Sequence, residues 1–163
     1  MSNKDQMHQN ASVSYKMISI NEGYFFYINP PASGIENYDA INLRYELSHL
    51  FDWSQNTGIC TVFLDIKFFY FTNDVKTVLF ETKLLINYLL INGEQYITVT
   101  ENEINMELSL STMLLSIAIS TARGYLAAKM AATEYKNILL PIINPGQLIK
   151  DAEEKNKAAK NII

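Results

Sequence analysis

The feature that most constrains this fold is residues 111–133, a long segment in which almost every side chain is apolar or small. Only Arg123 and Lys129 are charged between Ser111 and Thr133. Leucine, isoleucine and alanine recur there at helical spacing, which predicts one long helix. Such a helix has to be covered on nearly every side. The rest of the chain offers one sheet to cover it, so we expect other copies of the chain to cover the remainder.

The segments before this helix alternate apolar and polar residues with a period of two, which is typical of β-strands. The expected strands are 13–28, with a bend or bulge at 21–23, then 41–48, 59–71 and 75–91. The short turn between the last two runs predicts an antiparallel meander. The sequence therefore predicts an α+β fold, with a four-stranded antiparallel sheet followed by a long helix and a short C-terminal helix.

The boundaries of the two helices are less evenly marked. The long helix begins either near the capping-box spacing of residues 100–103 or at Ser109 or Ser111, and residues 94–102 are ambiguous between loop and short strand. The second helix is expected to start at Asn144-Pro145, an N-cap followed by proline, and to run to about residue 160. We expect a disordered tail over 1–12 and a single domain over 13–163.

Charge and cysteine content exclude several function classes. The net charge is −4 and the thirteen basic residues are scattered, so a nucleic-acid interface is not expected. A single cysteine cannot form an intrachain disulfide, which favours a reducing compartment. No apolar run approaches the roughly 20 residues of a membrane span, and the first ten residues lack an apolar signal core. We therefore expect a cytoplasmic protein that does not insert into membranes.

Residues that carry chemistry are few. His8 falls in the expected tail, and His49 follows a predicted strand and is expected at its surface end. Cys60 opens a strand, where a buried, unreactive thiol is the default. Glu101 and Glu103 are expected as acids at a helix start. The sequence offers no cluster of metal ligands and no phosphate-cradling glycine motif, so we expect no metal, no cofactor and no enzymatic activity.

A stripe of small residues on the predicted long helix is the first feature with a possible function. Its members, spaced four apart, are Ser116, Ser120, Gly124 and Ala128. One interpretation is that the stripe lies on the chain's own sheet. The other, which we favour, is self-association, because glycine costs a helix roughly 0.5–1 kcal/mol relative to alanine and is retained for another reason.

An excess of aromatic residues is the second such feature. Consecutive aromatics place rings on both faces of a strand, so one face can enter the core while the other meets a subunit or a ligand. The rings expected to form such a binding surface are Tyr24, Phe25, Phe26, Tyr27, Phe51, Trp53, Phe69 and Phe71.

The order of these elements resembles the SecB export-chaperone family and its SecB-like relatives. The resemblance covers about residues 13–155 and rests on Ala122-Arg123 in the helix, Thr133 after it, the stretch 140–144 and Leu148 in the final helix. The opening strand that ends at Asn29-Pro30 is similar to that of the family.

The resemblance implies a homotetramer, with the long helices held between sheets, that binds unfolded polypeptides without ATP in long apolar grooves and serves protein export. The basic tail after Lys155 and the mild acidity depart from the exporting members, so docking to the motor SecA is not expected. Two alternatives stay open: a chaperone dedicated to an antitoxin-type client, and a non-catalytic oligomeric protein that binds partners or small apolar ligands.

Overall fold

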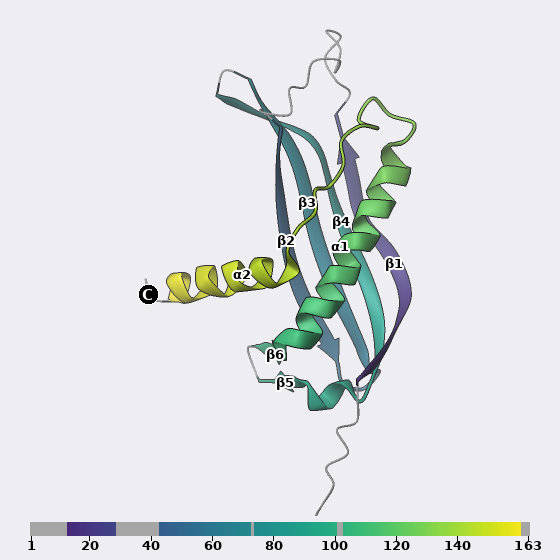
Figure 1. Ribbon diagram of the computed structural model, residues 1–163, viewed down its shortest axis with the longest axis vertical. Coiled ribbons are helices and arrows are strands. Elements are labelled where there is room, and N and C mark those ends of the chain that lie inside the picture. Colours follow the sequence, from purple (N-terminus) through teal and green to yellow (C-terminus); the bar gives the residue numbers. More distant parts are fainter. Residues whose placement is uncertain (1–12, 29–42, 73, 101–102, 161–163) are drawn as a thin grey trace, which may run out of the picture.

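A computed structural model describes residues 13–28, 43–72, 74–100 and 103–160 (Figure 1). The predicted tail, the loop after residue 28 and Glu101 lie outside these ranges. The strands are β1 (Ser14–Tyr27), β2 (Leu43–Ser54), β3 (Ile59–Thr72), β4 (Val75–Ile91), β5 (Ile97–Val99) and β6 (Ile104–Met106). The helices are the short 3-10 helix η2 (Gly93–Gln95), α1 (Leu108–Met130) and α2 (Pro145–Lys160).

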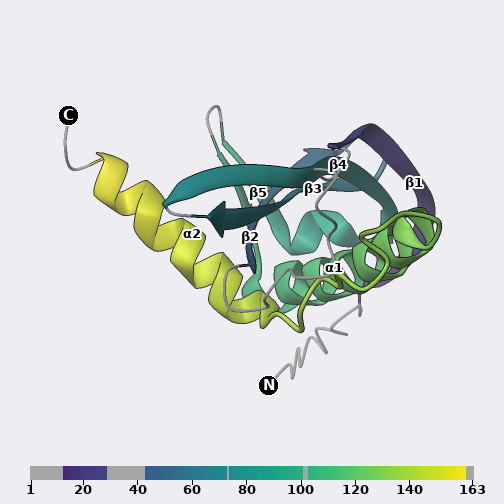
Figure 2. The same cartoon turned by 90° about the horizontal axis from the view of Figure 1, so that it is seen from above.

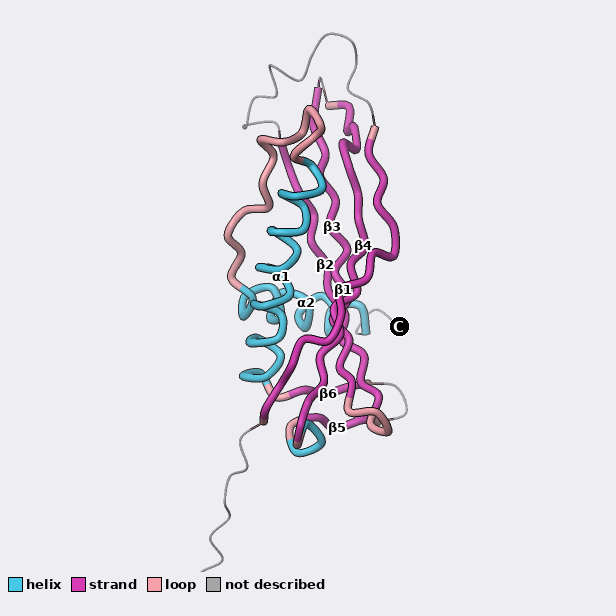
Figure 3. Tube along the Cα trace, turned by 90° about the vertical axis from the view of Figure 1, so that its right-hand side faces the viewer, coloured by secondary structure: helices cyan, strands magenta, loops and turns pink. Residues whose placement is uncertain are grey.

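The four long strands form one antiparallel sheet in the order β1-β4-β3-β2, which confirms the predicted architecture. The helix α1 lies along one face of this sheet (Figures 2 and 3). Among the described residues no helix runs along the opposite face, although the end of α2 and the β5–β6 hairpin reach past the margins of the sheet to that side. We call these two faces the helix face and the outer face. Both β1 and β2 are edge strands, because each pairs with only one neighbour.

Strand β1 joins the two runs that the sequence separates by a bend. Its pairing with β4 shifts between Met17 and Ser19 and again between Glu22 and Tyr24. The second irregularity confirms the bulge expected at 21–23, where Gly23 sits against Leu85: a Cβ there would lie 3.2 Å from Leu85 Cδ1. Bulges twist an edge strand, so β1 bends along its length.

Alternation along β3 and β4 divides their side chains cleanly between the two faces. The helix face of β3 buries Val62, Leu64, Ile66 and Phe68. On β4 the pattern breaks at a bulge, because Phe80 pairs with Phe68 while Val78 pairs with Phe69. Period-two alternation along 75–91 would predict that Val78 shares a face with Phe80, and this is wrong: Val78 follows Phe69 to the outer face.

Helix α1 buries one side on the sheet and begins at Leu108. Its N-cap is Glu107, whose carbonyl accepts from the amide of Ser111 at 3.0 Å. The helix therefore begins one residue before Ser109, close to the later predicted start and not near residues 100–103. The Tyr88 hydroxyl of β4 donates to the Leu114 carbonyl of α1 at 3.3 Å, which fixes the helix on the sheet.

The second helix begins as the sequence predicts. The Asn144 side-chain oxygen accepts from the amide of Gln147 at 3.2 Å, and Pro145 takes the first helical position. The C-terminal half of α2 projects from the β2 edge of the sheet (Figures 1 and 2). The crossover segment, residues 131–144, connects the end of α1 to α2 along the helix face (Figures 1 and 3).

The ambiguous region after β4 folds into η2 and a small hairpin of β5 and β6. Here the chain passes so close to Trp53 that only glycine fits at residue 93. A Cβ at Gly93 would lie 2.8 Å from Leu90 Cβ and 3.1 Å from the Trp53 ring. This contact closes one end of the core.

Substitution Gly93→Ala is expected to lower the free energy of unfolding by about 1–3 kcal/mol, because the added methyl overpacks the Trp53 contact. Urea unfolding followed by Trp53 fluorescence measures the change. The matched control is Gly146→Ala, where a Cβ meets only Asn144 Oδ1 at 3.5 Å and stability is expected to stay or rise. Equal stability of the two variants would contradict the assignment of Gly93 as a close-packing position.

Candidate functional site

The eight aromatic residues predicted to form a binding surface do not gather at one place. Tyr24, Phe26, Tyr27 and Phe71 are exposed, while Phe25 and Phe51 are half-buried. Trp53 is only 8% and Phe69 only 6% exposed. These two buried rings offer no accessible surface within the chain, so a client-binding role rests on the other six and stays a prediction.

Strand β1 carries the densest exposed apolar surface. Seven of the sixteen large hydrophobic residues exposed in the described part of the chain lie on it. They are Tyr15, Met17, Ile18, Ile20, Tyr24, Phe26 and Tyr27. Because β1 is an edge strand, its outer backbone N–H and C=O groups also lack a strand partner within the sheet. The strand therefore offers apolar side chains and main-chain hydrogen bonds together.

A continuous aromatic row crosses the helix face, with one ring from each long strand. Phe25, Phe80, Phe68 and Tyr45 follow one another with ring centroids 6.5, 4.6 and 6.0 Å apart. The two central rings, Phe80 and Phe68, are buried, whereas Tyr45 at the β2 edge is 42% exposed. The sequence analysis did not predict this row. The pattern that could have indicated it is that Tyr45 and Phe68 both occupy helix-face positions of the period-two alternation, where they pair across β2 and β3.

Two contacts hold the β1 end of this row against α1. The ammonium of Lys129 lies 2.9 Å from the Glu22 carboxylate and 5.1 Å from the centre of the Phe25 ring. A cation over an aromatic face is attracted by its quadrupole. Lys129 therefore connects the C-terminal turn of α1 to the aromatic half of β1.

The outer face carries a charged ladder in which each of three acids is paired with a lysine. Lys67 lies 3.0 Å from Glu81, Lys83 3.9 Å from Asp65, and Lys76 2.8 Å from Glu46. All six side chains are at least partly exposed, so each pair contributes little stability. Their mutual neutralisation leaves this ladder without net charge.

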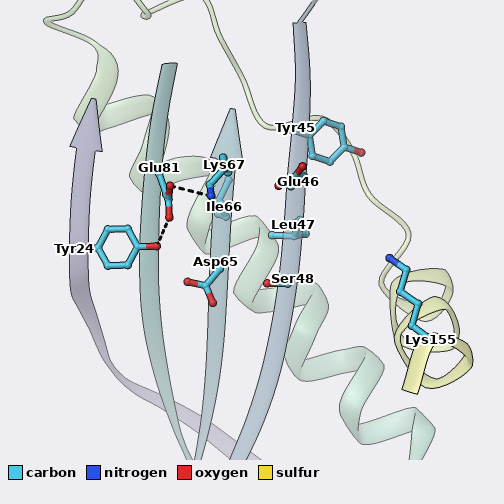
Figure 4. A pocket seen from close by; sticks show the side chains of 10 residues that line it. All are labelled: Tyr24, Tyr45, Glu46, Leu47, Ser48, Asp65, Ile66, Lys67, Glu81 and Lys155. Atoms are coloured by element: carbon cyan, nitrogen blue, oxygen red, sulfur yellow. Dashed lines mark hydrogen bonds and ion pairs between the residues drawn. The ribbon is translucent and has the colours of Figure 1, made fainter. Parts of the chain in front are cut away.

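An open pocket of about 580 Å³ lies over the ladder and reaches the β2 edge (Figure 4). It is lined by Tyr24, Tyr45, Glu46, Leu47, Ser48, Asp65, Ile66, Lys67, Glu81 and Lys155. The Tyr24 hydroxyl donates to Glu81 at 2.7 Å, which raises the pKa of Tyr24 to about 12. The same hydrogen bond, followed by that from Lys67, lowers the pKa of the Glu81 carboxyl. On this wall Tyr24, Glu81 and Lys67 therefore form one hydrogen-bonded network (Figure 4).

The small-residue stripe of α1 faces away from the sheet. Ser116, Ser120, Gly124 and Ala128 are all exposed, and a Cβ at Gly124 would meet nothing within 4 Å. The interpretation that the stripe lies on the chain's own sheet is therefore wrong. The sheet contacts the opposite side of the helix, through residues such as Leu114, Ala118 and Ala122.

His49 and Cys60 occupy positions that do not suit catalysis. His49 lies within β2, not beyond its end as expected, because the strand continues to Ser54. It is half-buried against Phe51, and burial lowers the pKa of its imidazole. Cys60 is fully buried as predicted, and burial raises the pKa of its thiol to about 12. Among the described residues no group of three His, Cys, Asp or Glu could hold a metal.

Comparison with known proteins finds a solved structure with a similar fold but no protein with a similar sequence. Neither protein-family models nor curated proteins match the chain. A SecB-like chaperone of Mycobacterium tuberculosis, Rv1957, solved with a ChAD peptide from the antitoxin HigA1, superimposes with a TM-score of 0.51. The chain has a SecB-like fold. The match covers 79% of this chain and 90% of the mycobacterial one at 15% identity, so the shared property is the fold.

A second solved structure is a Streptococcus agalactiae protein of unknown function. It is 10% identical, with 81% of this chain and 100% of that chain covered, at a TM-score of 0.32.

No helix in the described part of the chain is long and apolar enough to cross a membrane.

The thiol of Cys60 is expected to resist modification in the native protein. A raised pKa means that the thiol stays protonated at pH 8, and full burial blocks access to it. With Ellman's reagent at pH 8 we expect one reactive thiol per chain in urea and almost none without it. Rapid stoichiometric reaction of the folded protein would contradict the placement of Cys60 in the core.

Proposed function

We propose that this chain is an ATP-independent holdase, a chaperone that binds unfolded or nascent polypeptides along apolar surfaces in the cytoplasm. The observation that carries the proposal is the apolar edge strand β1 on a SecB-like fold. Exposed rings and unpaired main-chain groups together suit an extended chain of many possible sequences. The six accessible predicted rings, Tyr24–Tyr27, Phe51 and Phe71, are the proposed client contacts.

A client of antitoxin type is the second candidate, and one finding favours it. The mycobacterial protein of the same fold was solved with a peptide from an antitoxin. A chaperone dedicated to one such client would bind one sequence tightly and unrelated unfolded proteins weakly. The neutral ladder on the outer face gives no support to docking of a motor such as SecA, so export is not part of the proposal.

The decisive experiment is suppression of aggregation of a chemically unfolded protein by the purified chain. A holdase protects the client at near-stoichiometric ratios without nucleotide. A dedicated chaperone protects only its own client, and a non-catalytic interaction protein protects none.

We also propose that the chain assembles into a homo-oligomer, most simply a tetramer, through the stripe of Ser116, Ser120, Gly124 and Ala128. Small side chains let two helix backbones approach closely. The stripe is exposed and apolar or weakly polar along several turns, with Ala127 and Ala131 beside it. A surface of this kind on a single chain is typical of a subunit contact.

Substitution Gly124→Leu is expected to weaken assembly by about 1–3 kcal/mol, because a large side chain overpacks a close contact. Light scattering over a range of micromolar concentrations measures the shift toward smaller species. The control is Glu154→Leu on the projecting part of α2, which adds the same side chain outside the stripe. A wild-type monomer at these concentrations would refute the assembly.

The double substitution Phe26→Ala/Tyr27→Ala is expected to weaken client binding roughly thirtyfold. About half of each ring is already buried, so a client gains about 1 kcal/mol per ring. Fluorescence anisotropy of labelled, reduced and carboxymethylated α-lactalbumin measures the affinity. The control Ile91→Ala removes an equally exposed apolar side chain from β4. Equal affinity of both variants would exclude β1 as the client surface.

A further inference from the structure

The crossover segment, residues 131–144, lies against the helix face and buries three of its side chains there. Tyr135, Ile138 and Leu140 are 1%, 9% and 2% exposed. Between and after them, Leu139 is 60% and Ile142 87% exposed. Residues 138–144 adopt neither helix nor strand. After the turns of residues 131–137, residues 138–142 therefore present apolar side chains alternately into the molecule and out of it.

The buried side chains of this segment belong to the same core cluster as the aromatic row. The Tyr135 ring centroid lies 6.1 Å from that of Phe80, the central ring of the row on β4. The Tyr135 hydroxyl donates to the Ile28 carbonyl at the end of β1 at 2.6 Å. The row continues beyond this contact to the exposed Tyr45 at one sheet edge and to Phe25 and Tyr27 at the other.

Side chains hold this segment more than its backbone does. Backbone hydrogen bonds form successive turns up to Ile138, whose amide donates to the Tyr135 carbonyl, and Leu148 donates to Asn144. Among the described residues, none involves the amides or carbonyls of 139–143. A stretch without backbone pairing opens locally at lower cost than a paired strand. Its release breaks the hydrogen bond from Tyr135 to the Ile28 carbonyl and otherwise uncovers mainly rings, since the strands beneath keep their ladders.

We propose that the aromatic row is a client site and that residues 135–140 occupy it as an internal stand-in for a client. Incoming chains displace this segment. The stand-in defines the ligand class: a peptide with an aromatic residue followed, across one turn, by aliphatic residues three and five positions later, as in Tyr135, Ile138 and Leu140. This inference rests on the proposed holdase function and adds a site to the β1 surface.

Displacement gives the segment a measurable effect on affinity. When only the open fraction of molecules binds, the apparent dissociation constant is the intrinsic constant divided by that fraction. Any change that weakens closure therefore tightens client binding by the same factor. A segment that instead forms part of the binding wall would give the opposite sign.

Substitution Tyr135→Phe tests whether weaker closure of the segment tightens or weakens client binding. It keeps the ring and removes the hydrogen bond to Ile28. Loss of one such bond changes the closing equilibrium about three- to tenfold, so client peptide is expected to bind about three- to tenfold more tightly. The probe is a labelled synthetic peptide of residues 133–143 carrying Lys136→Gln. A companion peptide with Tyr135, Ile138 and Leu140 replaced by serine is expected not to bind.

The matched control is Leu139→Ala/Ile142→Ala, which trims the outward side of the same segment. Displacement predicts unchanged affinity for this variant. Binding on top of the segment predicts weaker affinity.

The rate of trypsin cleavage at Lys136 measures directly whether the segment is displaced. The probe peptide lacks lysine and arginine, so only the protein is cut. Displacement predicts faster cleavage at Lys136 when the peptide is bound.

Three results would each overturn the inference. They are slower cleavage at Lys136 with peptide bound, equal or weaker peptide binding by the Tyr135→Phe variant, and no binding of the probe peptide.

Binding of unfolded α-lactalbumin distinguishes failure of this inference from failure of the holdase proposal. If it binds the wild-type protein while the peptide tests fail, only the displaced-segment site is wrong.

Discussion

The packing of α1 on the sheet determines which parts of the helix face other segments have to cover. A helix of 23 residues spans about 35 Å, whereas the 17 residues of β4 span about 55 Å. One helix therefore cannot cover the helix face from end to end. The crossover segment covers part of what remains, and the β5–β6 hairpin with Gly93 closes the other end over Trp53. Apolar coverage is thus divided between a rigid helix and a segment with little backbone support.

Much of this fold could be predicted from the sequence, because apolar and polar residues alternate along its strands but recur at helical spacing in its long helix. Period-two runs predicted all four long strands, and Asn144-Pro145 predicted the start of α2. Local pattern could not show that β2 continues past His49. Nor could it show the bulge that sends Val78 to the outer face, because apolar residues occupy both faces of β4 there. Register is fixed by cross-strand partners, which a single sequence does not display.

The candidate site was less predictable than the fold, for a related reason. Consecutive aromatics in β1 and β3 indicated rings on both faces but not which face would be covered. Phe69 is buried on the outer face beneath the Lys76 ammonium, 3.9 Å from its ring centre. Trp53 is enclosed by a glycine forty residues later in the chain. The direction of the α1 stripe likewise depends on which side of the helix meets β3.

The paired acids and lysines on the outer face have a kinetic consequence. Long-range attraction between a protein and a charged partner raises association rates and falls steeply with ionic strength. Each acid of the ladder lies within 4.0 Å of its own lysine, so its field is cancelled close to the surface. The ladder itself therefore adds little to the electrostatic steering of a charged partner, and this contribution changes little with salt concentration.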